Sequence, residues 1–379
     1  MSGDDAKARA AGAERGFAAR ERGAAEQTAA PAVGTPGEPW WGQPPADAKV
    51  ALHVGEWRDG AWSYLYDDTE YAASSGDGGL EARGARDDDP PFVIGPMIHG
   101  PVWTWEVPAY FWFGGMAAGS SFVALACDLA GDHRSARIAR ATALATVLPA
   151  PPLLIMDLGR PARFLNMLRI FKPRSPMSLG AWCLVAFSTA AAGAVGLDVL
   201  GRERAARVAG GLNAVLGAYL GSYTGVLLAT TAVPLWARSR LFLGPIFVCT
   251  GAATGAAVNR LVLRAAGLPE GHPTQVALGR VETGAMAAEL LLSAINERRL
   301  GPLAEGLEQG TPGRQYRAAK WSVRAGFALR LARRRRAHDL ASLLYLLAGL
   351  LFRFAWVGAG RRSAGDDEQV AAMARGRTA

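Results

Sequence analysis

The chain has 379 residues, of which 50% are hydrophobic and 20% charged, and its formal net charge is +8. Such averages would suit a soluble protein of one to three domains with a nucleic-acid partner. The order of the residues argues against both, because uncharged runs long enough to cross a bilayer recur from Tyr110 onward, and the Lys and Arg residues of membrane proteins gather in loops. We therefore expect a membrane protein that binds no nucleic acid.

The chain begins with a polar region. Residues 1–95 are rich in Gly, Pro and Asp, and we predict a largely disordered segment there. The stretch HVGEWRDGAWSYLYDD leaves a hairpin or a docking segment open as an alternative. No apolar run follows the N-terminus, so it resembles neither a secretory nor a twin-arginine signal. We expect a transmembrane domain at 96–362 and a tail at 363–379.

The rest of the chain predicts an all-α fold, a polytopic transmembrane helix bundle of about eight spans. The seventh span is doubtful, because its apolar run has only about a dozen residues and is interrupted by Arg324 and Arg330. A surface-lying amphipathic helix over 321–338 is the alternative. The predicted spans cover 114–130, 138–156, 181–199, 208–233, 242–263, 275–295, the doubtful seventh segment and 340–360.

Small and charged residues mark positions within these spans. Gly115, Gly119 and Ser120 in the first span permit the close approach of another helix. Asp128 and Asp198 close the first and third spans, where a charge at a helix end is ordinary. The Lys and Arg residues of the loops do not decide the orientation. If the crossings alternate, the loop after Asp157 lies on the same side of the membrane as the N-terminus.

Several motifs in one order resemble the NrfD family, which includes the membrane subunit of polysulfide reductase. They are W-x-W-E-x-P-x-Y-F-x-x-G-G-x-A-A-G from Trp103, DLGRPxRFxxML followed by KPxSPMSxGAW from Asp157, GSYTGVLLATTAVPLW from Gly221 and LFRFAWVGAG from Leu351. The resemblance covers about residues 95–362. It implies a multi-pass subunit of the inner or plasma membrane that exchanges electrons between the quinone pool and a ferredoxin-like iron-sulfur subunit, which serves a molybdopterin-type catalytic subunit.

The family subunit usually holds no haem or iron-sulfur cluster, and the sequence agrees. The histidines fall in the polar head, in loops or at span edges, so no pair could ligate a haem within the bilayer. The cysteines lie far apart, so we predict no metal site and no cluster. A membrane quinone, menaquinone or ubiquinone, is then the expected redox substrate. The residues concerned are His53, His99, His133, His272, His338, Cys127, Cys183 and Cys249.

The resemblance also indicates quinone-site residues. Tyr223 matches a family tyrosine at the quinone site, although a buried tyrosine could instead bond to a neighbouring helix carbonyl. The family often has a histidine beside the tryptophan that Trp103 resembles, and this chain has Val102 there. His99 and Glu106 remain as candidates for proton exchange. The departure leaves open a purely structural anchor without quinone chemistry.

The docking loop is a second prediction from these motifs. Asp157 and Arg160 are three residues apart, so they could pair and, with Arg163, order the loop as a docking surface for the iron-sulfur subunit. An ordinary belt of arginines at the membrane lipid headgroups is the alternative.

Charged side chains inside spans cost about 2.5–3.5 kcal/mol each, so they are candidates for function. Glu282 and Glu289 are seven residues apart, which places them on one helix face about 10 Å apart, and we predict a proton relay. Alternatively, Glu282 lies at the interface and pairs with Arg280. Arg353 in the last span could pair with one of these glutamates or extend to the membrane surface.

Overall fold

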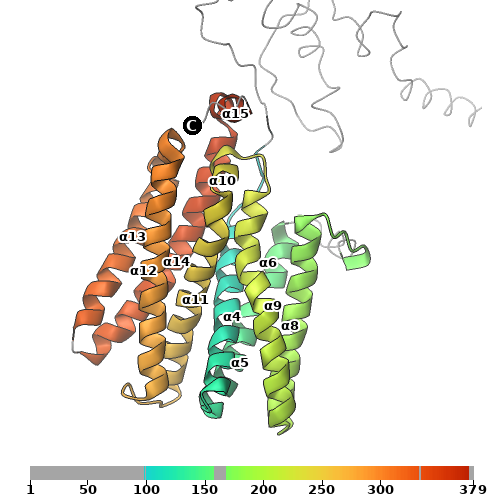
Figure 1. Cartoon of the computed structure of the whole chain (residues 1–379), viewed down its shortest axis with the longest axis vertical. Helices are drawn as coiled ribbons and strands as arrows, with labels where there is room; N and C mark the ends of the chain where they lie inside the picture. Colours follow the sequence, from blue (N-terminus) through green and yellow to red (C-terminus); the bar gives the residue numbers. More distant parts are fainter. Residues whose placement is uncertain (1–97, 99, 158–167, 333, 375–379) are drawn as a thin grey trace, which may run out of the picture. The chain divides into compact units, whose positions relative to one another are not determined.

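The computed structural model describes residues 98, 100–157, 168–332 and 334–374 of the chain (Figure 1). The expectations for residues 1–95, including the disordered segment and the hairpin, lie outside the described residues. From Ile98 onward the chain forms one compact unit. All elements of the described residues are helices, which confirms the predicted all-α class.

The long helices run side by side along one axis (Figure 1). The turn between α8 and α9 contains Gly201, whose φ of 71° is readily adopted only by glycine. Ser175 caps α8 by accepting a hydrogen bond from the N–H of Ser178, and Pro176 follows as its first residue. The helices are α4 (Glu106–Leu129), α5 (His133–Val147), α6 (Ala150–Asp157), α8 (Pro176–Val199), α9 (Glu203–Ala229), α10 (Pro234–Arg238), α11 (Arg240–Ala265), α12 (Pro273–Leu300), the 3-10 helix η2 (Gly301–Leu307), α13 (Gly310–Leu331), α14 (Arg335–Ala364) and α15 (Asp367–Ala374).

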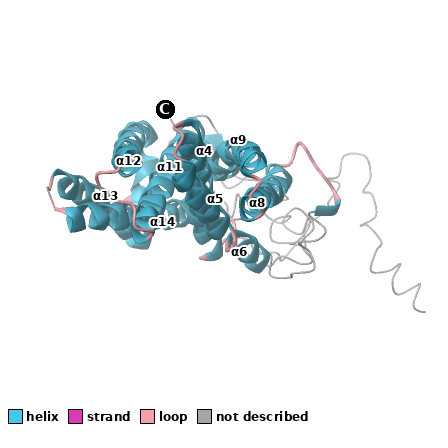
Figure 2. Cartoon of the chain, turned by 90° about the horizontal axis from the view of Figure 1, so that it is seen from below, coloured by secondary structure: helices cyan, strands magenta, loops and turns pink. Residues whose placement is uncertain are grey.

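The long helices form two groups (Figure 2). The first group is α4, α5 with α6, α8 and α9, and the second is α11, α12, α13 and α14. Helix α4 packs against both α9 and α11, and α14 packs against α11 and α13, so α4 and α11 join the groups. The upper face, at the top of Figure 1, carries the start of α4 and the end of α14, and we call the opposite end the lower face.

Six helical segments of the described chain are long and apolar enough to cross a membrane: α4, α5 with α6, α8, α9, α11 and α14. Helices α12 and α13 are also long, but more polar. The predicted seventh segment at 321–338 differs from the structure, because α13 begins at Gly310, ends at Leu331 and packs along α14 (Figure 1). The alternative of a surface-lying helix is therefore wrong. Lys320 of α13, whose side chain is 26% exposed, pairs with Glu297 of α12 at 2.7 Å.

Helices α4 and α11 cross through glycines on both sides. A Cβ added to Gly119 would lie 2.9 Å from the Cα of Gly255 and even nearer to the carbonyl of Gly251. A Cβ on Gly255 would overlap the backbone of Gly119 in the same way. Gly115 also faces Gly251, so both helices present glycines four residues apart, a spacing that allows helix backbones to touch within membranes. The close approach predicted for Gly115 and Gly119 is confirmed.

A buried arginine ties the lower ends of three helices together. Arg140 of α5 is 4% exposed and donates to both carboxylate oxygens of Asp198 on α8, at 2.6 and 2.8 Å. Its third nitrogen donates to Asp128 of α4 at 2.5 Å. Asp128 and Asp198 do lie at helix ends, as expected, and their shared partner gives them a structural role.

The two ends of the described chain meet on the upper face. Gly100 lies against Ala364 at the end of α14, and Ser363 accepts a hydrogen bond from the backbone N–H of Leu235 at 3.3 Å. Helix α6 also ends on this face. The segment after Asp157 thus leaves the bundle on the side where α4 begins, as alternating crossings predict.

Candidate functional site

A pocket of about 100 Å³ lies near the upper face, within the first helix group. Its wall includes Trp103 before α4, Asp157 at the end of α6, Gly180 near the start of α8 and Tyr223 in α9. Tyr110 of α4 adds a second tyrosine. Trp103 and Tyr223, which the sequence assigned to one site, are therefore neighbours of Asp157, which it assigned to the docking loop.

The side chain of Tyr223 is 3% exposed and packs on the bare backbone of Gly180. Its ring stacks on Tyr219 with the ring centroids 5.9 Å apart. Within the described residues, no side chain or carbonyl hydrogen-bonds to the Tyr223 hydroxyl, so the alternative of a neighbouring helix carbonyl finds no support there. A buried tyrosine hydroxyl usually has a partner, and this one lines a pocket in which a ligand could supply it.

The contact between Gly180 and Tyr223 leads to a first prediction. Replacing Gly180 with alanine should push the Tyr223 ring out of its place, because the added Cβ would overlap the end of that ring. We expect the pocket to change shape while the helix stays folded. Gly193 on the same helix is exposed and has open space around it, so Gly193→Ala is the matched control. Near-ultraviolet circular dichroism of the purified variants reports the packing of the aromatic rings, and an equal change in both variants would contradict the prediction.

Trp103 is fixed by other aromatic rings. Its ring stacks on Trp236 at 5.4 Å and meets Phe111 edge-on at 6.5 Å. The same tryptophan lines a second, open groove of about 580 Å³, which includes Arg361 and Arg362 of α14. Trp103 is thus the partition between the pocket and the groove.

Two carboxylates lie at this end of the bundle. Glu106 accepts a hydrogen bond from Thr104 and is close enough to Asp157 for an electrostatic interaction. Asp157 lines the pocket, whereas the predicted pair of Asp157 with Arg160 lies outside the described residues, as do Arg163 and the candidate His99.

Glu282 is fully buried in α12 and forms an ion pair with Arg330 of α13. Ser342 of α14 donates a hydrogen bond to the same carboxylate oxygen at 3.1 Å. The expected pair of Glu282 with Arg280 is wrong, because residues two apart on a helix point to different faces.

Glu289 is 4% exposed and accepts a hydrogen bond from Ser293 at 2.7 Å. Arg353 is 1% exposed, so the suggestion that it extends to the membrane surface is wrong. Its guanidinium lies 3.7 Å from the centroid of the Phe247 ring and donates to the Phe247 carbonyl at 3.1 Å. It interacts electrostatically with Glu289, without an ion-pair contact between the two in the described structure.

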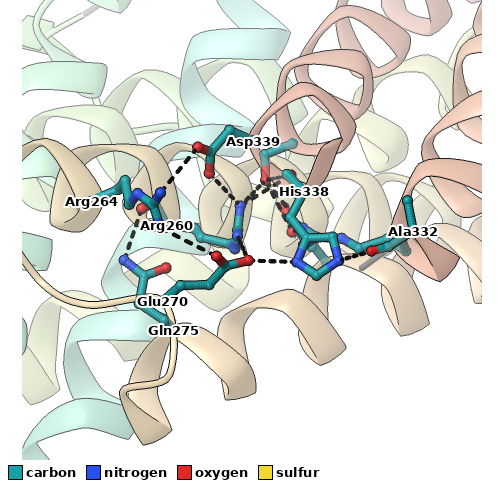
Figure 3. Close-up of polar contacts among 10 residues, drawn as sticks. Arg260, Arg264, Glu270, Gln275, Ala332, His338 and Asp339 are labelled. Carbon is teal, nitrogen blue, oxygen red and sulfur yellow. Dashed lines mark hydrogen bonds and ion pairs between the residues drawn. The ribbon is translucent and has the colours of Figure 1, made fainter. Parts of the chain in front are cut away.

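A polar cluster at the lower face was not predicted (Figure 3). Arg260 of α11 is 2% exposed and donates to Asp339 at 3.2 Å and to the carbonyl of His338 at 3.1 Å. Arg260 lies inside the predicted span 242–263, so the rule that singled out Glu282 also applied to it. Among the described residues, no group of three or more His, Cys, Asp or Glu side chains could hold a metal ion.

Comparison with known families agrees with the motifs. The family model described as "Polysulphide reductase, NrfD" matches residues 96–298, more than half of the chain. The matched range includes the upper pocket and both Glu282 and Glu289, and it ends within α12. No curated protein matches the chain.

Proposed function

The chain belongs to the NrfD family of multi-pass membrane subunits of oxidoreductase complexes, which are linked to the quinone pool, and from this we propose that it exchanges electrons between quinone and a partner subunit. The substrate is a menaquinone or ubiquinone of the inner or plasma membrane. The electron partner is a ferredoxin-like iron-sulfur subunit, which serves a molybdopterin-type catalytic subunit. On this proposal no haem or cluster resides in the chain itself.

The observation that carries the proposal is the buried hydroxyl of Tyr223 in one pocket with Trp103 and Asp157. A quinone head group needs a flat apolar wall, a hydrogen-bond donor for its carbonyl oxygen and a group that exchanges protons. Trp103 supplies the wall and Tyr223 the donor. Oxidation of a quinol releases two electrons and two protons, and Asp157 with its neighbour Glu106 is placed to accept a proton.

The volume of the pocket bears on how the head group enters. About 100 Å³ is less than the roughly 300–1,000 Å³ of small-molecule pockets, so a head group also needs room beyond the present walls. The groove of about 580 Å³ begins on the other side of Trp103. We infer that a bound head group lies against the Trp103 ring and extends past it toward this groove.

The partner subunit would dock on the upper face. Helix α6 ends there with Asp157, which lines the pocket, so a cluster bound above this end would be near the quinone. Asp157, Arg160 and Arg163 are the residues that we assign to this docking loop.

The test is the substitution Tyr223→Phe, which removes the hydroxyl and keeps the ring. We expect quinol-dependent reduction of the iron-sulfur clusters in the purified complex to slow by on the order of tenfold. This factor corresponds to the loss of one hydrogen bond that stabilises the transition state by about 1.4 kcal/mol. Tyr219→Phe is the matched control, because Tyr219 is 42% exposed and lies outside the pocket lining. An unchanged rate, with no quinone in the purified complex, would favour the structural anchor.

Protons must also move to and from the quinone, and we assign Glu282 and Glu289 to this movement. Both carboxylates are buried within the second helix group. Their place on one face of α12 supports the assignment, since such groups are costly in a membrane unless they have a function.

A further inference from the structure

We propose that Glu282 and Glu289 exchange protons with opposite faces of the membrane, and that an apolar layer around Met286 separates the two paths. The inference rests on the proton role proposed above, but assigns the two carboxylates to two separate paths instead of one relay. Two carboxylates seven residues apart would form one continuous relay only if polar groups filled the distance of about 10 Å between them. The side chains around α12 show a different arrangement.

The path from Glu282 opens toward the lower face. Arg330, its ion-pair partner, lines a polar pocket of about 460 Å³ together with Arg260, Glu270 and His338. Ser342 links the groups, since it accepts hydrogen bonds from Arg260 and Arg330 at 3.1 Å each and donates to Glu282. A pocket of this volume is large enough for many waters. Glu282 thus connects with the lower face through polar groups.

His338 is placed to carry a proton at the mouth of this pocket (Figure 3). One ring nitrogen lies 2.7 Å from the carboxylate of Glu270 and the other 2.8 Å from the carbonyl of Ala332. His338 therefore links Glu270 to the residue that follows α13. Arg260 and Arg264 both pair with Glu270, at 3.8 and 3.6 Å, and with Asp339, at 3.2 and 3.8 Å.

The path from Glu289 opens toward the upper face. Glu289 and Lys320 line one cavity of about 10 Å³, close to the volume that a single water needs. Lys320 lies 2.7 Å from Glu297, which also accepts a hydrogen bond from Tyr316 at 2.6 Å. The side chains of Lys320 and Glu297 are 26% and 23% exposed, so this chain of groups reaches the surface.

Apolar side chains fill the space between the two paths. Met286 is 1% exposed and lies between Glu282 and Glu289 on the same face of α12. Each other helix of the second group adds to the layer. The buried cluster consists of Ala253 from α11, Met286 from α12, Val323 from α13, and Tyr345 and Ala348 from α14. Tyr345 forms its lower boundary, because its hydroxyl lies near Arg330.

The arrangement predicts that the resting protein is nearly impermeable to protons. Protons reach Glu282 from below and Glu289 from above, and the apolar layer holds the two populations apart. A redox-driven change that joins the paths would move protons across the membrane. Without it, the alanine, valine and methionine side chains beyond the Tyr345 hydroxyl offer a proton no charged group to bind, so passive leakage is slow.

The test measures proton leakage through the purified full chain in liposomes, with a potassium gradient, valinomycin and an enclosed pH-sensitive dye. We expect wild-type protein to be tight and Met286→Ser to leak on the order of tenfold faster, equivalent to about 1.4 kcal/mol in the barrier. Leu291→Ser is the matched control, because Leu291 lies on the same helix and is 63% exposed. Adding Glu282→Gln or Glu289→Gln to Met286→Ser should return the leak to the wild-type level.

Several outcomes would overturn the proposal. One is a wild-type chain that leaks as fast as Met286→Ser, and another is a double variant that still leaks. A folded Met286→Ser chain that stays tight is a third. If this variant fails to fold, as judged by circular dichroism and gel filtration, Val323→Ser on the facing helix takes its place. The assay needs neither quinone nor a partner subunit, so its failure leaves the quinone proposal standing, and failure of the Tyr223 test leaves this one standing.

Discussion

Replacing Arg140 with methionine is expected to lower the free energy of unfolding by about 3–5 kcal/mol, the usual cost of removing one partner of a buried ion cluster. Asp128 and Asp198 would lose the cation that lies between them. Both side chains are less than a tenth exposed, so water could not replace the arginine. Titration of the detergent-purified chain with SDS, followed by circular dichroism, measures the loss.

Arg137 provides the control on the same helix. Its pair with Glu203, at 3.0 Å, is exposed at the surface, where such pairs contribute about 0–1 kcal/mol. Arg137 also lies 3.8 Å from Asp198, but its side chain is 53% exposed, so Arg137→Met should cost much less stability than Arg140→Met. A further variant, Arg140→Met with leucine at both aspartate positions, should regain most of the stability, because it removes the buried charges together. A loss below about 1 kcal/mol in Arg140→Met would show that water reaches the cluster.

The second large effect is expected where α4 crosses α11. Gly119→Ala should cost about 1–3 kcal/mol, the range for overpacking, because the new Cβ meets backbone atoms of Gly251 and Gly255, which cannot rotate away. Gly119→Leu should prevent the two helix groups from joining. Thermal unfolding in detergent measures the loss of stability in each variant, and gel filtration detects aggregation of a chain whose helix groups do not join.

Gly114 is the control for this prediction. It lies on the same helix, and a Cβ there would meet nothing within 4 Å. Gly114→Ala should even stabilise α4 slightly, because alanine is favoured over glycine in helices by about 1 kcal/mol. Equal melting temperatures for the two alanine variants would mean that the helices are farther apart than described.

The apolar spans were predictable because a bilayer imposes length and polarity on each helix separately. The error at the seventh helix has a physical reason. Its polar first half is stabilised by Glu297 of α12, and a hydropathy pattern cannot show that a charge on one helix is paired by another. The predicted seventh segment therefore began at residue 321, although α13 begins at Gly310.

The sequence was enough to predict several residues of the site, but not which side chains they contact. Charges in apolar runs identified Glu282, Glu289 and Arg353 without any structure. Which groups pair depends on which helices are neighbours, so the sequence suggested Arg280, nearby in the chain, where the fold supplies Arg330. The aromatic motifs likewise identified Trp103 and Tyr223, but only the fold shows that Asp157 lies in the same pocket.

The contact of Gly100 with Ala364 has a practical consequence for experiments on topology. Since α4 starts where α14 finishes, reporter proteins fused ahead of residue 98 or behind residue 374 would sit in one compartment. A single protease-accessibility assay on sealed vesicles would then orient the entire bundle, and with it the sidedness of the Tyr223 cavity.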